Sequence, residues 1–251
     1  CGVSGAGKSS LVNAFYEDLK SILNNHNNLK SNKTTKHSNK NVTKYCSKID
    51  DVNDLRKVEF IDRRPIAKTN ASIPATYLDV FSHIREIYSE LPQTQIAGIK
   101  AQDFSLAKEG GRCEECKGKG EIVLQMRFLS DARIKCSFCD GKRYKDNILQ
   151  IKYKGLSIAE VLDLSIDEAV EFFKNKIHII KKLQPAQDLG LGYIKLGQSS
   201  SSLSGGESQR LKLVPYFSKK YSNNSVLILE EPTSGLHFDD VNKLLNALNY
   251  L

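Results

Sequence analysis

A glycine-rich loop near the start of the sequence constrains the fold more than any other feature. Residues 2–9 read GVSGAGKS and fit the phosphate-binding pattern G-x-x-x-x-G-K-[ST] at every fixed position. Glycines allow successive backbone N–H groups to converge on phosphate oxygens, and the N-terminus of the following helix adds its positive end. Such a loop joins a buried strand to a helix, so it predicts an α/β nucleotide-binding core.

The residues of this loop have distinct expected roles. Lys8 reaches the β- and γ-phosphates of ATP, and Ser9 ligates Mg²⁺. The segment 10–15 continues in a helical pattern, as the motif requires. The nucleotide-binding residues predicted in this part of the chain are Gly2, Ser4, Gly5, Gly7, Lys8, Ser9 and Ser10.

Composition excludes several classes of protein. The 251 residues contain no apolar run near the roughly 20 residues of a membrane span. The first residues lack the charged-then-apolar layout of a signal peptide, which predicts a cytoplasmic protein with no membrane partner. Lys and Arg outnumber Asp and Glu by 37 to 29, and the resulting charge of +8 suits a polyanionic partner such as nucleic acid.

Local patterns predict several elements. Residues 24–44 contain seven Asn, five Lys and no acidic residue, which predicts a mobile loop. Near residue 60 the sequence predicts a strand, a loop and then a helix. Two successive capping boxes, Ser157-x-x-Glu160 and Ser165-x-x-Glu168, predict short helices around 158–163 and 166–175. Their apolar residues Val161, Leu162, Val170 and Phe173 are expected in the core.

Four of the six cysteines form two close pairs. Cys113-x2-Cys116 and Cys136-x2-Cys139 are separated by 19 residues, within the spacing of a structural zinc site. Four thiolates complete a tetrahedron and leave no open coordination position, so the predicted Zn²⁺ is structural. Gly118 and Gly141 follow each pair and allow the turns to close, and 121–129 reads as a strand. A redox pair or an iron–sulfur cluster is the alternative.

Basic residues surround these cysteines. They either contact DNA phosphates or form a solvated face around a metal site, and the sequence leaves both interpretations open. The residues are Arg112, Lys117, Lys119, Arg127, Arg133, Lys135, Lys142, Arg143 and Lys145.

The chain also resembles ABC ATPases in two later motifs. Residues 203–210 read LSGGESQR, a signature in which Ser204, Gly205, Gly206 and Glu207 open a helix and bind the γ-phosphate held by the opposite nucleotide-binding half. Residues 225–237, SVLILEEPTSGLH, resemble the Walker B strand and D-loop. By that resemblance Glu230 holds Mg²⁺ through water, and Glu231 polarises the attacking water.

A more specific resemblance covers most of the chain. The segments SIPATYLDVFSHIRE, GGRCEECKGKG, CSFCDGKRY, LDLSIDEAVEFF, DLGLGYIKLGQSSSSLSGGESQR and EEPTSGLHFDDV resemble the C-terminal nucleotide-binding half of UvrA, the ATPase of the UvrABC excinuclease. His237, where most ABC proteins carry Asp, agrees with this family. The resemblance implies ATP-driven recognition of damaged duplex DNA in bacterial nucleotide excision repair. The implied partners are a second copy of the protein, in a homodimer, and a loading protein of the UvrB type.

The implied fold is an ABC-type (P-loop) ATPase core of α/β class, interrupted by a helical insertion and a small C4 zinc module. The expected division is 1–60 for the start of the core, 61–112 for the Q-loop region and helical insertion, 113–145 for the zinc module, 146–185 for a helical connector, and 186–251 for the signature, Walker B and D-loop. The implied cofactors are ATP, Mg²⁺ and Zn²⁺.

Three residues depart from the family pattern. Arg63 replaces the Q-loop Gln, Glu230 replaces the Walker B Asp, and Pro215 lies inside the expected signature helix. We also expect the chain to be an internal fragment, because no strand precedes the phosphate loop and no switch histidine follows the D-loop. The fragment is therefore expected to hydrolyse ATP poorly or not at all.

Three alternative functions remain open at the sequence level. A transporter ATPase shares the nucleotide motifs but has no use for the four cysteines. A zinc-dependent chaperone module explains C-x-x-C-x-G-x-G at 113–120 but not LSGGESQR. A UvrA-like paralogue that binds ATP without efficient hydrolysis, concerned with self-resistance to a DNA-binding drug, fits the substitutions at Arg63 and Glu230.

Overall fold

The structure is a computed structural model that describes residues 6–31, 43–52, 54–66, 72–126, 132–218, 224–236 and 238–250. The chain divides into two compact units. Unit 1 comprises Cys1–Arg63 and Lys219–Ser234, and unit 2 comprises Arg64–Ser218 and Gly235–Leu251. The five-part division expected from the sequence stays a prediction.

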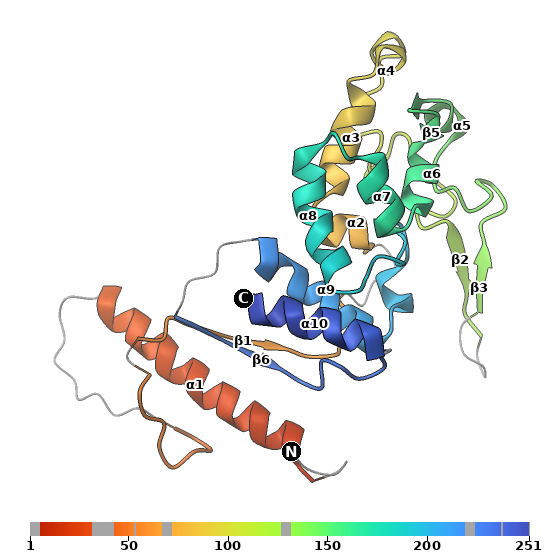
Figure 1. The fold of residues 1–251 in the computed structure, drawn as a ribbon. Helices are drawn as coiled ribbons and strands as arrows, with labels where there is room; N and C mark the ends of the chain where they lie inside the picture. The colour runs from red at the N-terminus through yellow and green to blue at the C-terminus, as the bar shows by residue number, and fades with distance from the viewer. Residues whose placement is uncertain are drawn as a thin grey trace. The chain divides into compact units, whose positions relative to one another are not determined.

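Unit 1 is a helix packed on a pair of parallel strands. Helix α1 (Lys8–Ser31) contacts strand β1 (Lys57–Ile61), which pairs in parallel with strand β6 (Ser225–Leu229) (Figure 1). In the pairing, Ile61 lies opposite Leu229, so both strands end at the same edge. This places the residues that follow the two strands side by side.

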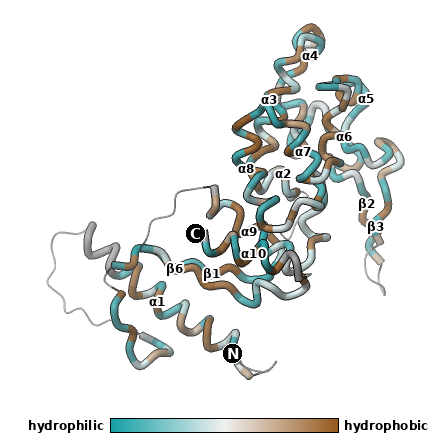
Figure 2. The backbone as a smooth tube through the Cα atoms, in the orientation of Figure 1, coloured by the Kyte–Doolittle hydropathy of each residue, from teal (hydrophilic) through white to brown (hydrophobic). Residues whose placement is uncertain are grey.

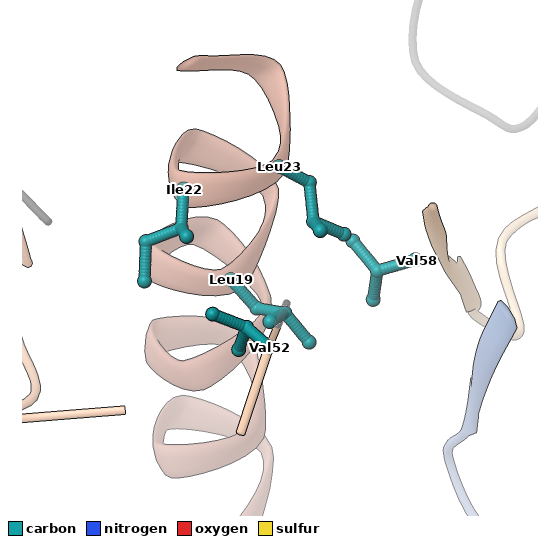
Figure 3. Close-up of a cluster of buried hydrophobic side chains, with 5 residues drawn as sticks. All are labelled: Leu19, Ile22, Leu23, Val52 and Val58. Atoms are coloured by element: carbon teal, nitrogen blue, oxygen red, sulfur yellow. The ribbon is translucent and has the colours of Figure 1, made fainter. Parts of the chain in front are cut away.

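The hydrophobic core of unit 1 is small. Leu19, Ile22 and Leu23 extend from α1, and Val58 of β1 lies opposite Leu23 (Figure 3). Val52 completes the cluster of buried side chains. The i, i+3, i+4 spacing of the three helical residues is that of one helix face turned towards the strands.

The expected loop at 24–44 is wrong in its first part. Helix α1 continues through residue 31, eight residues into that segment. Residues 32–42 lie outside the described part of the chain. Asn, His and Lys cost less than about 0.7 kcal/mol each in a helix, so a helix already anchored through Leu19, Ile22 and Leu23 can extend through them.

Unit 2 is built mainly from short helices, with two short antiparallel strand pairs (Figure 1). The helices are α2 (Pro74–Tyr77), α3 (Phe81–Ser89), α4 (Pro92–Ile96), α5 (Asp146–Leu149), α6 (Ile158–Asp163), α7 (Ile166–Phe172), α8 (Ile177–Asp188), α9 (Gly205–Ser218) and α10 (Phe238–Tyr250), with a 3₁₀ turn η1 (Ser200–Ser202). Strand β2 (Glu121–Leu124) pairs with β3 (Ala132–Lys135), and β4 (Lys152–Tyr153) pairs with β5 (Leu156–Ser157). Figure 2 shows hydrophobic and hydrophilic segments alternating along α3 and α8, as expected of helices with one buried face.

Large aromatic side chains fill the core of unit 2. Tyr88, Phe104, Tyr144 and Phe173 are fully buried. The Tyr144 hydroxyl donates to the Phe104 carbonyl at 2.8 Å, and the Tyr88 hydroxyl donates to the Leu156 carbonyl at 2.7 Å. The buried phenols are therefore paired, and they join segments far apart in the sequence.

Both predicted capping boxes are present, and they open α6 and α7. Ser165 accepts a hydrogen bond from the Glu168 N–H at 3.2 Å, and its own N–H donates to the Glu168 carboxylate at 2.8 Å. Ser157 and Glu160 form the same reciprocal pair. The second helix ends at Phe172, earlier than expected, because the backbone leaves helical geometry at Phe173. Within the described residues, no helix is both long and apolar enough for a membrane span.

Candidate nucleotide site, signature and cysteine cluster

The described end of the predicted phosphate loop meets Glu230 in unit 1. Gly7 has a left-handed φ of +76° and its carbonyl accepts from the Leu11 N–H at 3.0 Å, so it directs the chain into α1 at Lys8. The Ser9 hydroxyl donates to the Glu230 carboxylate. Glu230 directly follows β6, so the sheet edge brings the predicted Mg²⁺ ligands Ser9 and Glu230 into contact. Gly2, Ser4 and Gly5 lie outside the described residues.

Glu231 contacts an arginine that sequence reasoning did not connect to it. The Arg63 guanidinium lies 3.4 Å from the Glu231 carboxylate, across 168 residues of sequence. Each residue follows the end of its strand by two positions, and Ile61 pairs with Leu229. The parallel register therefore explains the contact, and a correct strand pairing would have revealed it. Both side chains are substantially exposed, so the pair contributes about 0–1 kcal/mol to stability.

The signature lies in unit 2, where it opens helix α9. Ser204 caps the helix: its hydroxyl accepts from the Glu207 N–H at 3.2 Å, and its N–H donates to the Glu207 carboxylate at 2.7 Å. Gly205 and Gly206 form the first turn. Pro215 lies within α9, which continues to Ser218. The helix thus accommodates this proline near its C-terminal end.

Tyr193 contacts the signature in a way that the sequence did not predict. Its hydroxyl donates to the other carboxylate oxygen of Glu207 at 2.7 Å. Burial and this hydrogen bond raise the pKa of Tyr193 to about 12, so the phenol is a donor at neutral pH. Burial would raise the pKa of Glu207, but the Tyr193 and Ser204 donors outweigh it and hold this pKa below its usual value. No spacing rule links a tyrosine to a carboxylate fourteen residues later.

The four cysteines converge on one point, and we call this group the cysteine cluster. The ligand atoms of Cys113, Cys116, Cys136 and Cys139 all lie within 4.8 Å of one another, and all four residues are buried. The two pairs fold alike. In the first pair, the Gly118 N–H donates to the Cys113 carbonyl, and in the second, the Gly141 N–H donates to the Cys136 carbonyl. Both glycines have the left-handed backbone geometry that closes such a turn.

The surroundings of the sulfurs suit metal-bound thiolates. The Gly120 N–H donates to Cys116 Sγ and the Arg143 N–H to Cys139 Sγ, each at 3.3 Å. Such N–H···S bonds orient ligands and stabilise negative charge on sulfur. Burial raises the pKa of Cys116 and Cys139, whereas at Cys136 backbone N–H donors outweigh burial and lower the pKa of the thiol. The type and number of donors and the hydrogen bonds around them therefore fit a zinc ion.

Arg143 differs from the other basic residues around the cluster. Its Nη2 donates to the Gly197 carbonyl at 2.6 Å, so its guanidinium is directed into the protein. Interpreting Arg143 as a phosphate contact is therefore not supported. Lys142, beside it in the sequence, is exposed.

Other basic residues around the cluster have acidic partners, among them Arg112 and Lys145, which both pair with Glu114. Lys135 forms an ion pair with Asp140 at 2.5 Å, and Arg133 forms one with Glu121 at 3.6 Å. These pairs offset part of the module's positive charge. Arg127 lies outside the described residues.

Comparison with known proteins supports the resemblance. No family model matches the chain. The chain is 45% identical over all 251 residues to UvrABC system protein A of Methanothermobacter thermautotrophicus and 44% identical to that of Clostridium tetani. In each case it spans 25% of the relative's length. The crystal structure of UvrA2 from Deinococcus radiodurans matches 80% of this chain and 24% of that chain, with a TM-score of 0.77 and 37% identity.

The structural match includes the ABC ATPase fold, and the sequence match extends over every residue of the chain. The chain is therefore similar along its whole length to UvrABC system protein A, and it spans one quarter of the length of those relatives.

Proposed function

We propose that this chain supplies ATP- and Mg²⁺-binding residues, one signature and a zinc module to an ATP-dependent DNA damage-recognition protein of nucleotide excision repair. The proposed partners are damaged duplex DNA, a loading protein of the UvrB type and a second copy of the protein. The contact between Ser9 and Glu230 carries the proposal, because it joins the phosphate loop to the Walker B carboxylate. The relatives' names support the repair function.

ATP binding is the first test. Lys8→Ala removes the ammonium that contacts the β- and γ-phosphates. A hydrogen bond to a charged group contributes about 1.5–3 kcal/mol, so we expect roughly a tenfold to hundredfold loss of affinity for a fluorescent ATP analogue in the presence of Mg²⁺. Lys20→Ala is the matched control, because Lys20 lies on the same helix over the Tyr16 ring and away from the loop. Equal affinity of Lys8→Ala and the unmodified chain would contradict the proposed nucleotide site.

We further propose that hydrolysis is slow, which is the second candidate function: ATP binding without efficient turnover. The observation that favours it is the Arg63–Glu231 ion pair, because a carboxylate oxygen that faces a guanidinium is less available to accept a hydrogen bond from the attacking water. Arg63→Gln should release Glu231 and raise the turnover of ATP. Arg56→Gln is the control, since exposed Arg56 precedes the same strand at its opposite end. A rate unchanged by Arg63→Gln would remove the ion pair as the cause.

Zinc and DNA binding need separate measurements. We expect one zinc ion per chain by elemental analysis, held by Cys113, Cys116, Cys136 and Cys139. A zinc-free chain that retains its fold would favour a transporter-type ATPase.

If exposed Lys142 contacts a DNA phosphate, Lys142→Ala should reduce the slope of log affinity against log salt by about one. An unchanged slope would favour a purely structural module.

A further inference from the structure

Arg143 lies where the cysteine cluster meets the residues that lead into the signature. Its backbone N–H donates to Cys139 Sγ at 3.3 Å, and its carbonyl accepts from the Cys113 N–H at 2.8 Å. The same residue therefore touches both cysteine pairs through its backbone. Its side chain extends the other way, and Nη2 donates to the Gly197 carbonyl at 2.6 Å.

The backbone of Arg143 depends on the cluster. It has a φ of +72°, a left-handed geometry that is unfavourable for a residue with a side chain. The two hydrogen bonds to Cys139 and Cys113 hold it there. A shift of the sulfurs would therefore change the direction in which the guanidinium leaves the backbone.

The guanidinium is fixed at its far end as well. It is partly buried, and a cation removed from water needs hydrogen-bonded partners and nearby opposite charge. The Gly197 carbonyl provides the partner, and the charges of Asp163 and Glu121 act favourably on the guanidinium. Arg143 thus connects two well-defined points rather than extending into solvent.

Gly197 cannot easily move away from this contact. Its N–H donates to the Leu162 carbonyl at 2.7 Å, and a Cβ at this position would lie 2.8 Å from the same oxygen. The chain then passes through the turn η1 to Ser204, the cap of the signature helix. We call residues 197–203 the pre-signature segment.

A second arginine of the zinc module holds the same segment. Arg133, on strand β3, donates from Nη1 to the Ser201 hydroxyl at 3.1 Å. This side chain is exposed and also pairs with Glu121, so it is the weaker of the two attachments. The module therefore contacts the pre-signature segment near both its start and its middle.

We propose that Arg143 is a positioning residue that links metal occupancy of the cysteine cluster to the order of the pre-signature segment and of the signature cap at Ser204. The metal fixes Cys139 and Cys113, these fix the backbone of Arg143, and the guanidinium fixes Gly197. The consequence for nucleotide chemistry rests on the proposed function. The link between the cysteine cluster and the pre-signature segment does not depend on that function.

Hydrogen–deuterium exchange of the full chain tests the link without nucleotide. The zinc-loaded and chelator-treated chains are compared for the amides of residues 198–208, in the unmodified protein, Arg143→Gln and Lys142→Gln. In the unmodified chain, zinc removal should raise exchange there at least tenfold. Arg143→Gln should show the raised exchange while zinc is still bound, as counted by a chromogenic chelator. Lys142→Gln, an exposed neighbouring cation, should behave like the unmodified chain.

Two results would overturn the proposal: exchange of residues 198–208 that does not respond to zinc removal, or full protection in zinc-loaded Arg143→Gln. If Arg143→Gln fails to bind zinc, Arg143→Lys is used instead. It keeps the charge but lacks the fork that reaches Gly197, so exchange should rise by an intermediate factor with zinc bound, and unchanged exchange would again overturn the link. ATP-analogue binding through Lys8 is measured in parallel, so a failure of the nucleotide site is distinguished from a failure of the link.

Discussion

Each unit carries residues predicted to contact ATP, but the packing around these residues differs between the two units. In unit 1, Ser9 and the carboxylates Glu230 and Glu231 lie at the edge of the paired parallel strands β1 and β6, which α1 contacts. In unit 2, the signature follows a segment held by α6 and by Arg143, and Tyr193 contacts Glu207 of the signature itself. The buried cluster between α1 and the strands of unit 1 has five apolar side chains, whereas the core of unit 2 contains fully buried aromatic side chains. The proposed catalytic carboxylates Glu230 and Glu231 therefore belong to the unit with the smaller described core.

Because of this difference, we expect local opening of the backbone to be more frequent in unit 1 than in unit 2. Regions with few buried apolar contacts open at a lower free energy than well-packed cores. We therefore expect amides of β1 and β6 to exchange faster than those of α8, whose Leu183 is fully buried.

Loss of the metal should have the largest effect, and it should be confined to unit 2. Structural zinc in small finger peptides binds with about 10–16 kcal/mol, so Cys136→Ser should cost more stability than any single apolar truncation. Thermal unfolding followed by circular dichroism, with zinc counted per chain, measures it. Cys46→Ser is the control, because Cys46 is a free cysteine of unit 1 outside the cluster. A large effect of Cys46→Ser on zinc content would contradict the prediction that the four cysteines of unit 2 alone bind the metal.

Truncating a core side chain of unit 2 should cause the second-largest loss of stability. Leu183→Ala removes a fully buried side chain from α8 and leaves a cavity, which costs about 2–5 kcal/mol. Denaturant unfolding measures the change in the free energy of unfolding. The exposed Leu245 of α10 offers a matched control, and Leu245→Ala should change stability by less than about 0.5 kcal/mol. Equal losses for both leucines would show that α8 does not form the core.

Asp18 should make unit 1 sensitive to acid. Burial of this carboxylate would raise its pKa, but backbone N–H groups of Lys44, Tyr45 and Cys46 donate to it at 2.6–2.8 Å and hold the pKa below its usual value. Because the folded-state pKa is depressed, the stabilisation is present above the unfolded pKa of about 3.9 and is lost as pH falls through the folded value.

Asp18→Asn should therefore destabilise unit 1 at neutral pH, and the difference from the unmodified chain should shrink as the pH falls below about 4. Exchange rates of α1 and β1 amides against pH measure it. The exposed Asp50 provides the control variant, Asp50→Asn, which should leave these rates unchanged. A destabilisation by Asp18→Asn that persists at the lowest pH would contradict the charge-based explanation.

The smallest expected effect concerns a helix cap. Ser165→Ala removes the acceptor for the Glu168 N–H at the start of α7 and should cost about 1 kcal/mol. Chemical denaturation resolves a difference of this size. Ser165→Asn retains a capping acceptor and should restore most of the loss. An alanine variant as stable as the original would mean that α7 is held by packing alone.

Features set by neighbouring residues were predictable from the sequence. The two capping boxes, the convergence of the cysteine pairs and the glycine turns at 118 and 141 follow from local spacing. Contacts between distant segments were not, because they depend on strand register and packing. Arg63 with Glu231 and Tyr193 with Glu207 are of this kind. The continuation of α1 to residue 31 was missed because tertiary anchoring outweighed composition.

The pairing of β1 with β6 also determines the order in which the chain can fold. Unit 1 is discontinuous, and the whole segment Arg64–Ser218 of unit 2 lies between its two parts. Closing a loop of that length as a flexible chain is entropically costly and slow, whereas local contacts within the segment form early. Once folded, the segment shortens the effective loop. We therefore expect the arrival of Glu230 beside Ser9 to be the last event in assembling the proposed nucleotide site.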